Sequence, residues 1–151
     1  MKPFKKVAVG GSFDVLHKGH KTLLKKAFEE GEYVLIGLTS SEMITKDISS
    51  FEKRKKSLES FLEGKGQYGI VELSNPMGDA ASDGAIDAIV VSEKTEHVAL
   101  EINNARKKNG LPALKILSIP LVLAADGRPI SSRRIKSGEI DEEGLVLSKQ
   151  K

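Results

Sequence analysis

Short, continuous apolar runs that alternate with helical segments are the feature that most constrains how this chain can fold. Runs such as YVLIGLT and AIVVS are apolar along almost their whole length, which is typical of strands buried on both faces. The segments between them repeat apolar residues at helical spacing. The sequence therefore predicts an α/β fold, with a parallel sheet of about five strands and helices on both faces. The predicted strands cover residues 6–10, 33–39, 68–73, 88–92 and 115–119, and the predicted helices cover 19–30, 51–62, 97–109 and a short segment from Ser131 or Ser132.

Length and composition favour one domain. The chain has 151 residues, which is enough for a single buried core, so we expect one domain over residues 1–151. It contains no cysteine, which excludes disulfides, thiolate metal sites and cysteine nucleophiles. No stretch approaches the ~20 apolar residues that a membrane span needs. We expect a cytoplasmic protein.

The net charge indicates anionic partners but does not identify which kind. A net charge of +3 fits nucleic acid or small anionic substrates. Aromatic residues make up only 5% of the chain and tryptophan is absent, so platforms for stacking bases are scarce. The densest basic run, residues 53–56, is expected to be the solvated face of a helix. Small-molecule substrates are therefore expected, with neither nucleic acid nor a membrane as a partner.

Two of the three histidines lie together in the stretch GGSFDVLHKGHKT, where the first strand ends and a helix begins. The stretch lacks the spacing of the dinucleotide motif G-x-G-x-x-G, and a histidine stands where a P-loop needs lysine directly after glycine. A zinc site at His17 and His20 lacks a third ligand of obvious spacing, so no metal ligands are predicted. Two surface histidines near a turn remain the simple alternative.

An anion cradle accounts for the whole stretch. Gly10 and Gly11 would let a ligand approach the backbone, and Gly19 would do the same at the helix start. Unpaired amides and the helix dipole attract phosphate there. His17 and His20 would add directed hydrogen-bond donors that need no full charge.

A second stretch, ISSRRIK over residues 130–136, has a related character. The hydroxyls of Ser131 and Ser132 and the amides at a helix start suit a phosphate chain. An ordinary N-cap pair is the alternative.

These two stretches resemble the signatures of the cytidylyltransferase-like nucleotidyltransferase superfamily. GSFDVLHKGH is similar to G-[ST]-F-D-x-x-H-x-G-H, and ISSRRIK is similar to I-S-S-T-x-I-R. Arg133 replaces a small hydroxyl residue and Lys136 replaces an arginine. The resemblance implies a single Rossmann-like nucleotidyltransferase domain that moves a nucleotidyl group from ATP or CTP to an acceptor and releases pyrophosphate.

Further stretches narrow the resemblance. VAVGGSFD, DAIVVSEKT, EINNARKKNGLPAL and LAADGRPISS resemble archaeal-type phosphopantetheine adenylyltransferases, from about Val7 to Asp141. The implied reaction joins ATP and 4′-phosphopantetheine to give dephospho-coenzyme A and pyrophosphate. Cytidylyl-transferring relatives usually carry R-T-E-G-I-S-T-T where this chain has GRPISS, which argues against CTP. The alternatives are an FAD-forming or cytidylyl-transferring relative, or a non-catalytic nucleotide-binding regulator.

The resemblance also implies roles for the histidine loop. His20 would stabilise charge on the α-phosphate, and His17 would bind the phosphate chain. Ser12 and Phe13 would frame the acceptor and the nucleotide. Asp14 would fix the loop by an Asx-type turn. We expect His20 to be exposed in this loop.

Other residues are assigned less fully. Lys46 would bridge the phosphates of the two substrates, with a solvated lysine as the alternative, and Arg54 is a weaker candidate. Arg133 could reach phosphate. Asn103 and Arg106 match a family pattern without an assigned role. Mg²⁺ is expected to be bound mainly through the phosphates of ATP, and the protein is expected to be a monomer or a small homo-oligomer.

Overall fold

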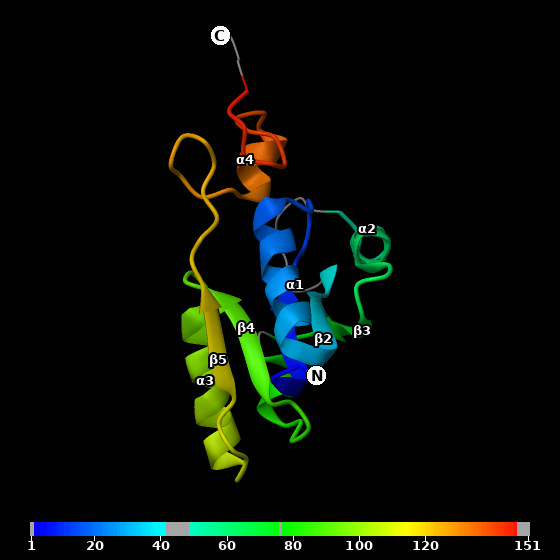
Figure 1. Ribbon diagram of the computed structural model, residues 1–151, viewed down its shortest axis with the longest axis vertical. Coiled ribbons are helices and arrows are strands. Elements are labelled where there is room, and N and C mark those ends of the chain that lie inside the picture. The colour runs from blue at the N-terminus through cyan, green and yellow to red at the C-terminus, as the bar shows by residue number, and fades with distance from the viewer. Residues whose placement is uncertain (1, 42–48, 76, 148–151) are drawn as a thin grey trace.

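The computed structural model describes residues 2–41, 49–75 and 77–147, and these residues form a parallel five-stranded sheet with helices on both faces. The strand order is β3-β2-β1-β4-β5 (Figure 1). The predicted α/β class is therefore confirmed. The strands are β1 (Phe4–Gly11), β2 (Gly31–Thr39), β3 (Gln67–Leu73), β4 (Ala88–Ser92) and β5 (Lys115–Ile119). The helices are α1 (Lys18–Glu30), α2 (Phe51–Leu62), α3 (Glu96–Lys108), α4 (Ser132–Lys136) and the 3₁₀ helix η2 (Gly78–Ala81).

The alternation of side chains along each strand divides the core into two layers. Val7 and Val9 of β1 face α1 and α2, where they pack with Leu24 and Leu58. Ala8 lies on the opposite face with residues of α3 and η2. In the described residues of the crossover from β3 to β4, the single turn of η2 is the one helical element, so this second face is more thinly covered than the first.

The strand order reverses between β1 and β4, which pair directly in the middle of the sheet. In open parallel sheets, ligands bind beyond the carboxyl ends of the strands at such a point. The chain returns to this place at its end, because α4 lies above the start of α1 in Figure 1. The amide of Lys18 donates to the carbonyl of Glu142 at 2.8 Å, which joins α1 to the segment after α4.

The structure differs from the sequence prediction in detail. Strand β1 begins at Phe4, and η2 had no sequence signal that we recognised. Gly31 ends α1 as expected but is extended, with φ −116°. Its missing side chain matters for packing instead, because a Cβ there would lie 2.7 Å from Cγ2 of Val7. Gly110 after α3 does take the left-handed conformation, with φ 77°. Among the described residues, no helix has both the length and the apolar character needed to cross a membrane.

Candidate active site

His17 is the N-cap of α1. Its Nδ1 accepts hydrogen bonds from the amides of Gly19 at 3.0 Å and His20 at 3.3 Å. Because a nitrogen that accepts carries no proton, the proton of the neutral ring lies on Nε2. Burial, and secondarily the charge of Lys21, lowers the pKa of His17 to about 4. His17 is therefore a neutral ring whose Nε2 is a donor at neutral pH.

The capping role changes the expected anion cradle. The amides of Gly19 and His20 are occupied by His17, the amide of Lys21 donates to the His17 carbonyl, and that of Lys18 donates to the segment after α4. The prediction of unpaired amides at the start of α1 is therefore wrong. Donors at this mouth come from side chains, because a helix terminus whose amides are satisfied offers few of its own.

The three site glycines serve different purposes. A Cβ on Gly19 would lie 2.9 Å from Cε1 of His17, closer than such atoms approach, so Gly19 makes room for the imidazole rather than for a ligand. Gly10 and Gly11 are less constrained, since a Cβ on either would make its nearest contact at 3.4 Å. Both line a cavity described below.

His20 is half-buried, so the expectation of an exposed side chain is wrong. Its ring stacks on that of His17 and also contacts Phe13, with ring centroids 5.2 Å apart. Burial, followed by the neighbouring His17, lowers the pKa of His20 to about 3, while the Val15 backbone and Asp14 oppose the shift. Its buried Nδ1 makes no hydrogen bond of good geometry within the described residues. The ring is neutral at physiological pH.

Phe13 has an unusual backbone for a bulky residue. Its φ is 45°, the one positive value outside glycine in the described part of the chain, and its side chain is buried. The left-handed region disfavours large side chains, so the surrounding structure must hold it in place. The carbonyl of the preceding Ser12 accepts a hydrogen bond from Nη1 of Arg54 at 3.0 Å.

Asp14 joins separate parts of the chain. One carboxylate oxygen accepts from the amide of Ser49 at 3.1 Å, and the other pairs with Lys136. Burial alone would raise the pKa of Asp14, but the hydrogen bonds from Lys136 and Ser49 lower it below its usual value. Asp14 thus fixes the loop, as expected, through distant partners rather than through an Asx-type turn.

The second motif meets the first through Ser132, whose Oγ accepts from the amide of Val15 at 3.4 Å. Ser131 is the N-cap of α4 and accepts from the amide of Arg134. Arg134 is buried and forms ion pairs with Asp126 and Glu139, so it supports α4. Arg133 is exposed on the same helix.

A cavity of about 250 Å³ brings the two motifs together. It is lined by His17, Gly19, His20, Ser131 and Ser132, and by the ends of β4 and β5. The sequence motifs are separated by more than a hundred residues, yet these five predicted residues share this space. The lining of this cavity does not include the other predicted residues of the two motifs, which are Gly10, Gly11, Ser12, Phe13, Asp14 and Arg133. Since each serine oxygen accepts from a backbone amide, its hydroxyl proton remains available for a phosphate.

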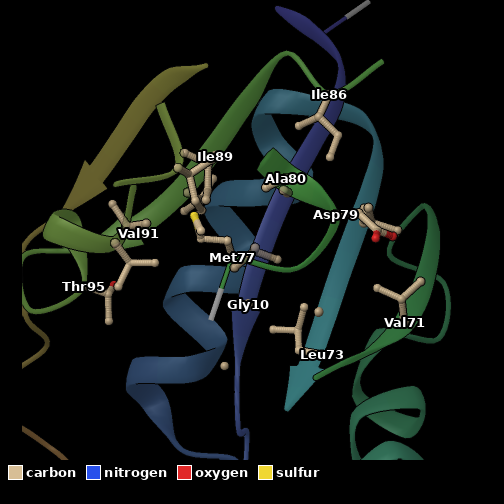
Figure 2. A pocket seen from close by; sticks show the side chains of 18 of the residues that line it. Gly10, Val71, Leu73, Met77, Asp79, Ala80, Ile86, Ile89, Val91 and Thr95 are labelled. Atoms are coloured by element: carbon tan, nitrogen blue, oxygen red, sulfur yellow. The ribbon is translucent and has the colours of Figure 1, made fainter. Parts of the chain in front are cut away.

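A second cavity, of about 240 Å³, lies over the thinly covered face of the sheet. Figure 2 shows residues that line it, among them Gly10 of β1 and Met77 and Ala80 on the segment after β3. Gly10 and Gly11 of β1 line it, and α3 contributes Val98. Its walls are mostly apolar. The two cavities flank the carboxyl ends of β1 and β4, the place where this fold binds ligands.

The four remaining candidates have different outcomes. Lys46 lies outside the described residues. Arg54 is 1% exposed, so the predicted solvated face over residues 53–56 is wrong at this position. Asn103 exchanges two hydrogen bonds with the backbone of Leu114. Arg106 is also buried and bonds the carbonyls of residues 80, 83, 86 and 112. Both therefore support the fold around α3.

The sheet order and the paired motifs define an α/β nucleotidyltransferase. A family model described as cytidylyltransferase-like matches residues 8–138. The phosphopantetheine adenylyltransferase of Methanothermobacter thermautotrophicus is 46% identical over 147 residues, covering 95% of this chain and 90% of that protein. That of Methanopyrus kandleri is 47% identical over 146 residues, covering 92% of each. The chain belongs to the cytidylyltransferase-like family, among its archaeal phosphopantetheine adenylyltransferases.

A solved structure agrees with this placement. The structure of a protein with unknown function from Archaeoglobus fulgidus has a TM-score of 0.69 and 31% sequence identity. The matched region covers 76% of this chain and 88% of the Archaeoglobus fulgidus chain. The resemblance inferred from the sequence is confirmed.

Proposed function

We propose that this chain transfers the adenylyl group of ATP to 4′-phosphopantetheine, giving dephospho-coenzyme A and pyrophosphate. The names of its relatives support this assignment. The structural observation that carries it is the cavity where the stacked, neutral pair His17 and His20 meets Ser131 and Ser132. That cavity offers neutral donors from two motifs to one phosphate chain.

The reaction needs positioning more than it needs a base. The acceptor phosphate is largely ionised at neutral pH, because its second pKa is about 6. One of its oxygens attacks the α-phosphorus of ATP in line. The new P–O bond forms as the bond to the β-phosphate oxygen breaks, and pyrophosphate leaves with the electron pair of that bond. His20 donates to the α-phosphate as its charge develops, and His17 holds the phosphate chain through Nε2–H.

The apolar cavity suits the rest of the acceptor. Pantetheine is a long, uncharged arm, and the cavity beside Gly10 and Gly11 is mostly apolar and extends along the sheet away from the histidines. In this arrangement the acceptor phosphate reaches the histidine loop while the arm lies under Met77 and Val98.

Mg²⁺ would accompany ATP and shield the charge of its phosphates. The described residues contain no group of three His, Cys, Asp or Glu side chains that could hold a metal ion. Phosphate oxygens and water would therefore supply its ligands. The proposal includes a cytoplasmic location and a monomer or small homo-oligomer, with small molecules as its partners.

Incubation with ATP or CTP and a panel of acceptors tests the proposal. The panel contains 4′-phosphopantetheine, glycerol-3-phosphate and FMN, and the readout is pyrophosphate release. ATP with 4′-phosphopantetheine should be the productive pair. Comparable release with CTP or with FMN would point to another member of the family. Binding of ATP without release from any pair would point to a regulator.

A further inference from the structure

We propose that Arg54 is a positioning residue for this transfer: it holds the Ser12 carbonyl and, through Phe13, sets the place of His20. The inference rests on the proposed reaction, in which His20 meets the α-phosphate. Arg54 itself touches no reacting atom in this arrangement. Its effect travels through three consecutive contacts.

The first contact is made by the guanidinium of Arg54, which reaches from the first turn of α2 to the carboxyl ends of two strands. Its Nη1 donates to the carbonyl of Ser12 at 3.0 Å and to that of Thr39 at 2.8 Å. Its Nε donates to the carbonyl of Ser49 at 2.9 Å. One side chain thus joins the histidine loop, the end of β2 and the start of α2.

Burial of this arginine carries a desolvation cost. It is 1% exposed, and burial lowers the pKa of its guanidinium, while the charges of Asp14 and Glu72 oppose that shift. Its buried Nη2 has no hydrogen-bond partner among the described residues. A buried charge with an unsatisfied donor is unfavourable compared with an apolar side chain. Leu58 and Leu62 fill the following turns of the same helix face, but an apolar residue at position 54 could not make the three hydrogen bonds to backbone carbonyls.

The second contact is the peptide that links Ser12 to Phe13. Arg54 holds the carbonyl directly before Phe13, the residue whose φ of 45° is disfavoured for a large side chain. When that carbonyl is released, the backbone can relax toward ordinary negative φ. The ring of Phe13 would then leave its present place in the core.

The third contact is between rings. Phe13 and His20 have centroids 5.2 Å apart with planes inclined by 58°. His20 therefore contacts the rings of both Phe13 and His17. Displacement of the Phe13 ring removes one of these two supports, and the donor moves away from the α-phosphate.

A double-mutant cycle on turnover distinguishes positioning from general support of the fold. Arg54→Lys is made in the natural chain and in the His20→Ala variant. For each protein, kcat is measured at saturating substrates, and the affinity for ATP is measured by calorimetry. In the natural chain we expect kcat to fall about 10-fold to 10²-fold, since small displacements of a catalytic group have effects of this size. ATP affinity should change less than about threefold, and in His20→Ala the loss should shrink to about twofold or less.

Arg106→Lys is the matched control, because Arg106 is equally buried and also bonds backbone carbonyls. It should lower the melting temperature and show the same effect on kcat in both backgrounds. Equal losses for Arg54→Lys in both backgrounds, or no loss of kcat at all, would overturn the inference.

Phe13→Leu supplies a second cycle in case Arg54→Lys does not fold. It keeps an apolar side chain but removes the ring that contacts His20. If Phe13→Leu lowers kcat less in the His20→Ala variant than in the natural chain, the inference is sustained, because the proposed route passes through this ring. Additive losses overturn it.

Discussion

The imidazole rings of His17 and His20 stack with their centroids 3.7 Å apart and their planes inclined by only 18°. Two protonated rings in this arrangement would repel each other in a partly dry site. Burial first, and neighbouring positive charge second, lower the pKa values of His17 and His20 to about 4 and about 3. The stack therefore belongs to the neutral state, in which each ring keeps one N–H donor.

The stack makes the stability of the protein depend on pH. An unfolded histidine has a pKa near 6.5, so between about 6.5 and 3 the unfolded chain binds more protons than the folded one. The contribution is complete above about pH 6.5, declines progressively as pH falls below that value, and is fully lost once pH has passed through about 4 and 3. Between about pH 7 and pH 5, the melting temperature of the natural chain should fall further than that of His20→Gln, which cannot titrate at this position. If the melting temperatures of the two proteins change in parallel with pH, His20 does not contribute to this pH dependence.

His20→Ala should mainly reduce turnover. A donor matched to charge that develops on the α-phosphate binds the transition state more strongly than bound ATP. Its loss should lower kcat by about 10²–10³, or about 2.7–4 kcal/mol. ATP should still bind within about tenfold of the natural chain in calorimetry.

Thr22→Ala, an exposed change two residues later on α1, is the control and should leave kcat near its natural value. If ATP affinity collapses in His20→Ala while turnover survives, His20 binds the ground state and the proposed role fails.

Gly19→Ala should reduce activity without increasing stability. Alanine is the better helix former by about 1 kcal/mol, so an unhindered change would stabilise α1. A Cβ here would lie 2.9 Å from Cε1 and 3.0 Å from Nδ1 of His17, so the ring must move and the cap weakens. We expect kcat to fall about tenfold or more, with no rise in melting temperature. A more stable and fully active variant would show that the His17 ring can shift at no cost.

Sequence reasoning located most of the fold because its signals are local. The run AIVVS is buried in the sheet as β4, and the predicted helix over residues 51–62 matches α2. The site motifs were found for the same reason, since residue type and spacing identify them. Their common cavity could be anticipated only from the rule that ligands bind where strand order reverses.

The burial of Arg54 and Arg106 was missed because their partners are backbone carbonyls, which have no residue identity to recognise. Arg54 bonds the carbonyl of Ser12, which lies 42 residues earlier. A partial signal was present, because Arg54 precedes Leu58 and Leu62 by one and two turns on the buried face of α2. The neutral state of His20 had no such signal, since it depends on burial between elements distant in sequence.

Lys136→Ala should destabilise the protein, and Lys136→Arg should not. The Asp14 side chain is 3% exposed, so removal of its cation leaves a buried carboxylate that keeps the Ser49 amide. The expected loss in free energy of unfolding is about 1–3 kcal/mol, measured in denaturant. Arginine can replace lysine as the partner, which would make the departure from the family signature a conservative one. Equal stability for the alanine and arginine variants would contradict this role.

Filling the apolar cavity should weaken use of the acceptor and leave ATP binding intact. Val98 is half-buried on α3 and lines this cavity, while the other cavity, of about 250 Å³, contains the histidines and both serines. Val98→Phe should raise the KM for 4′-phosphopantetheine by about tenfold or more, because even one additional methylene in an apolar pocket changes discrimination by 10–200-fold. The Kd for ATP, measured by calorimetry, should stay within about threefold. Leu100→Phe is the matched control, since Leu100 is 55% exposed on the same helix and outside the lining of the cavity. An unchanged KM in Val98→Phe would place the pantetheine arm elsewhere, and an equal rise in both variants would point to a general effect on α3.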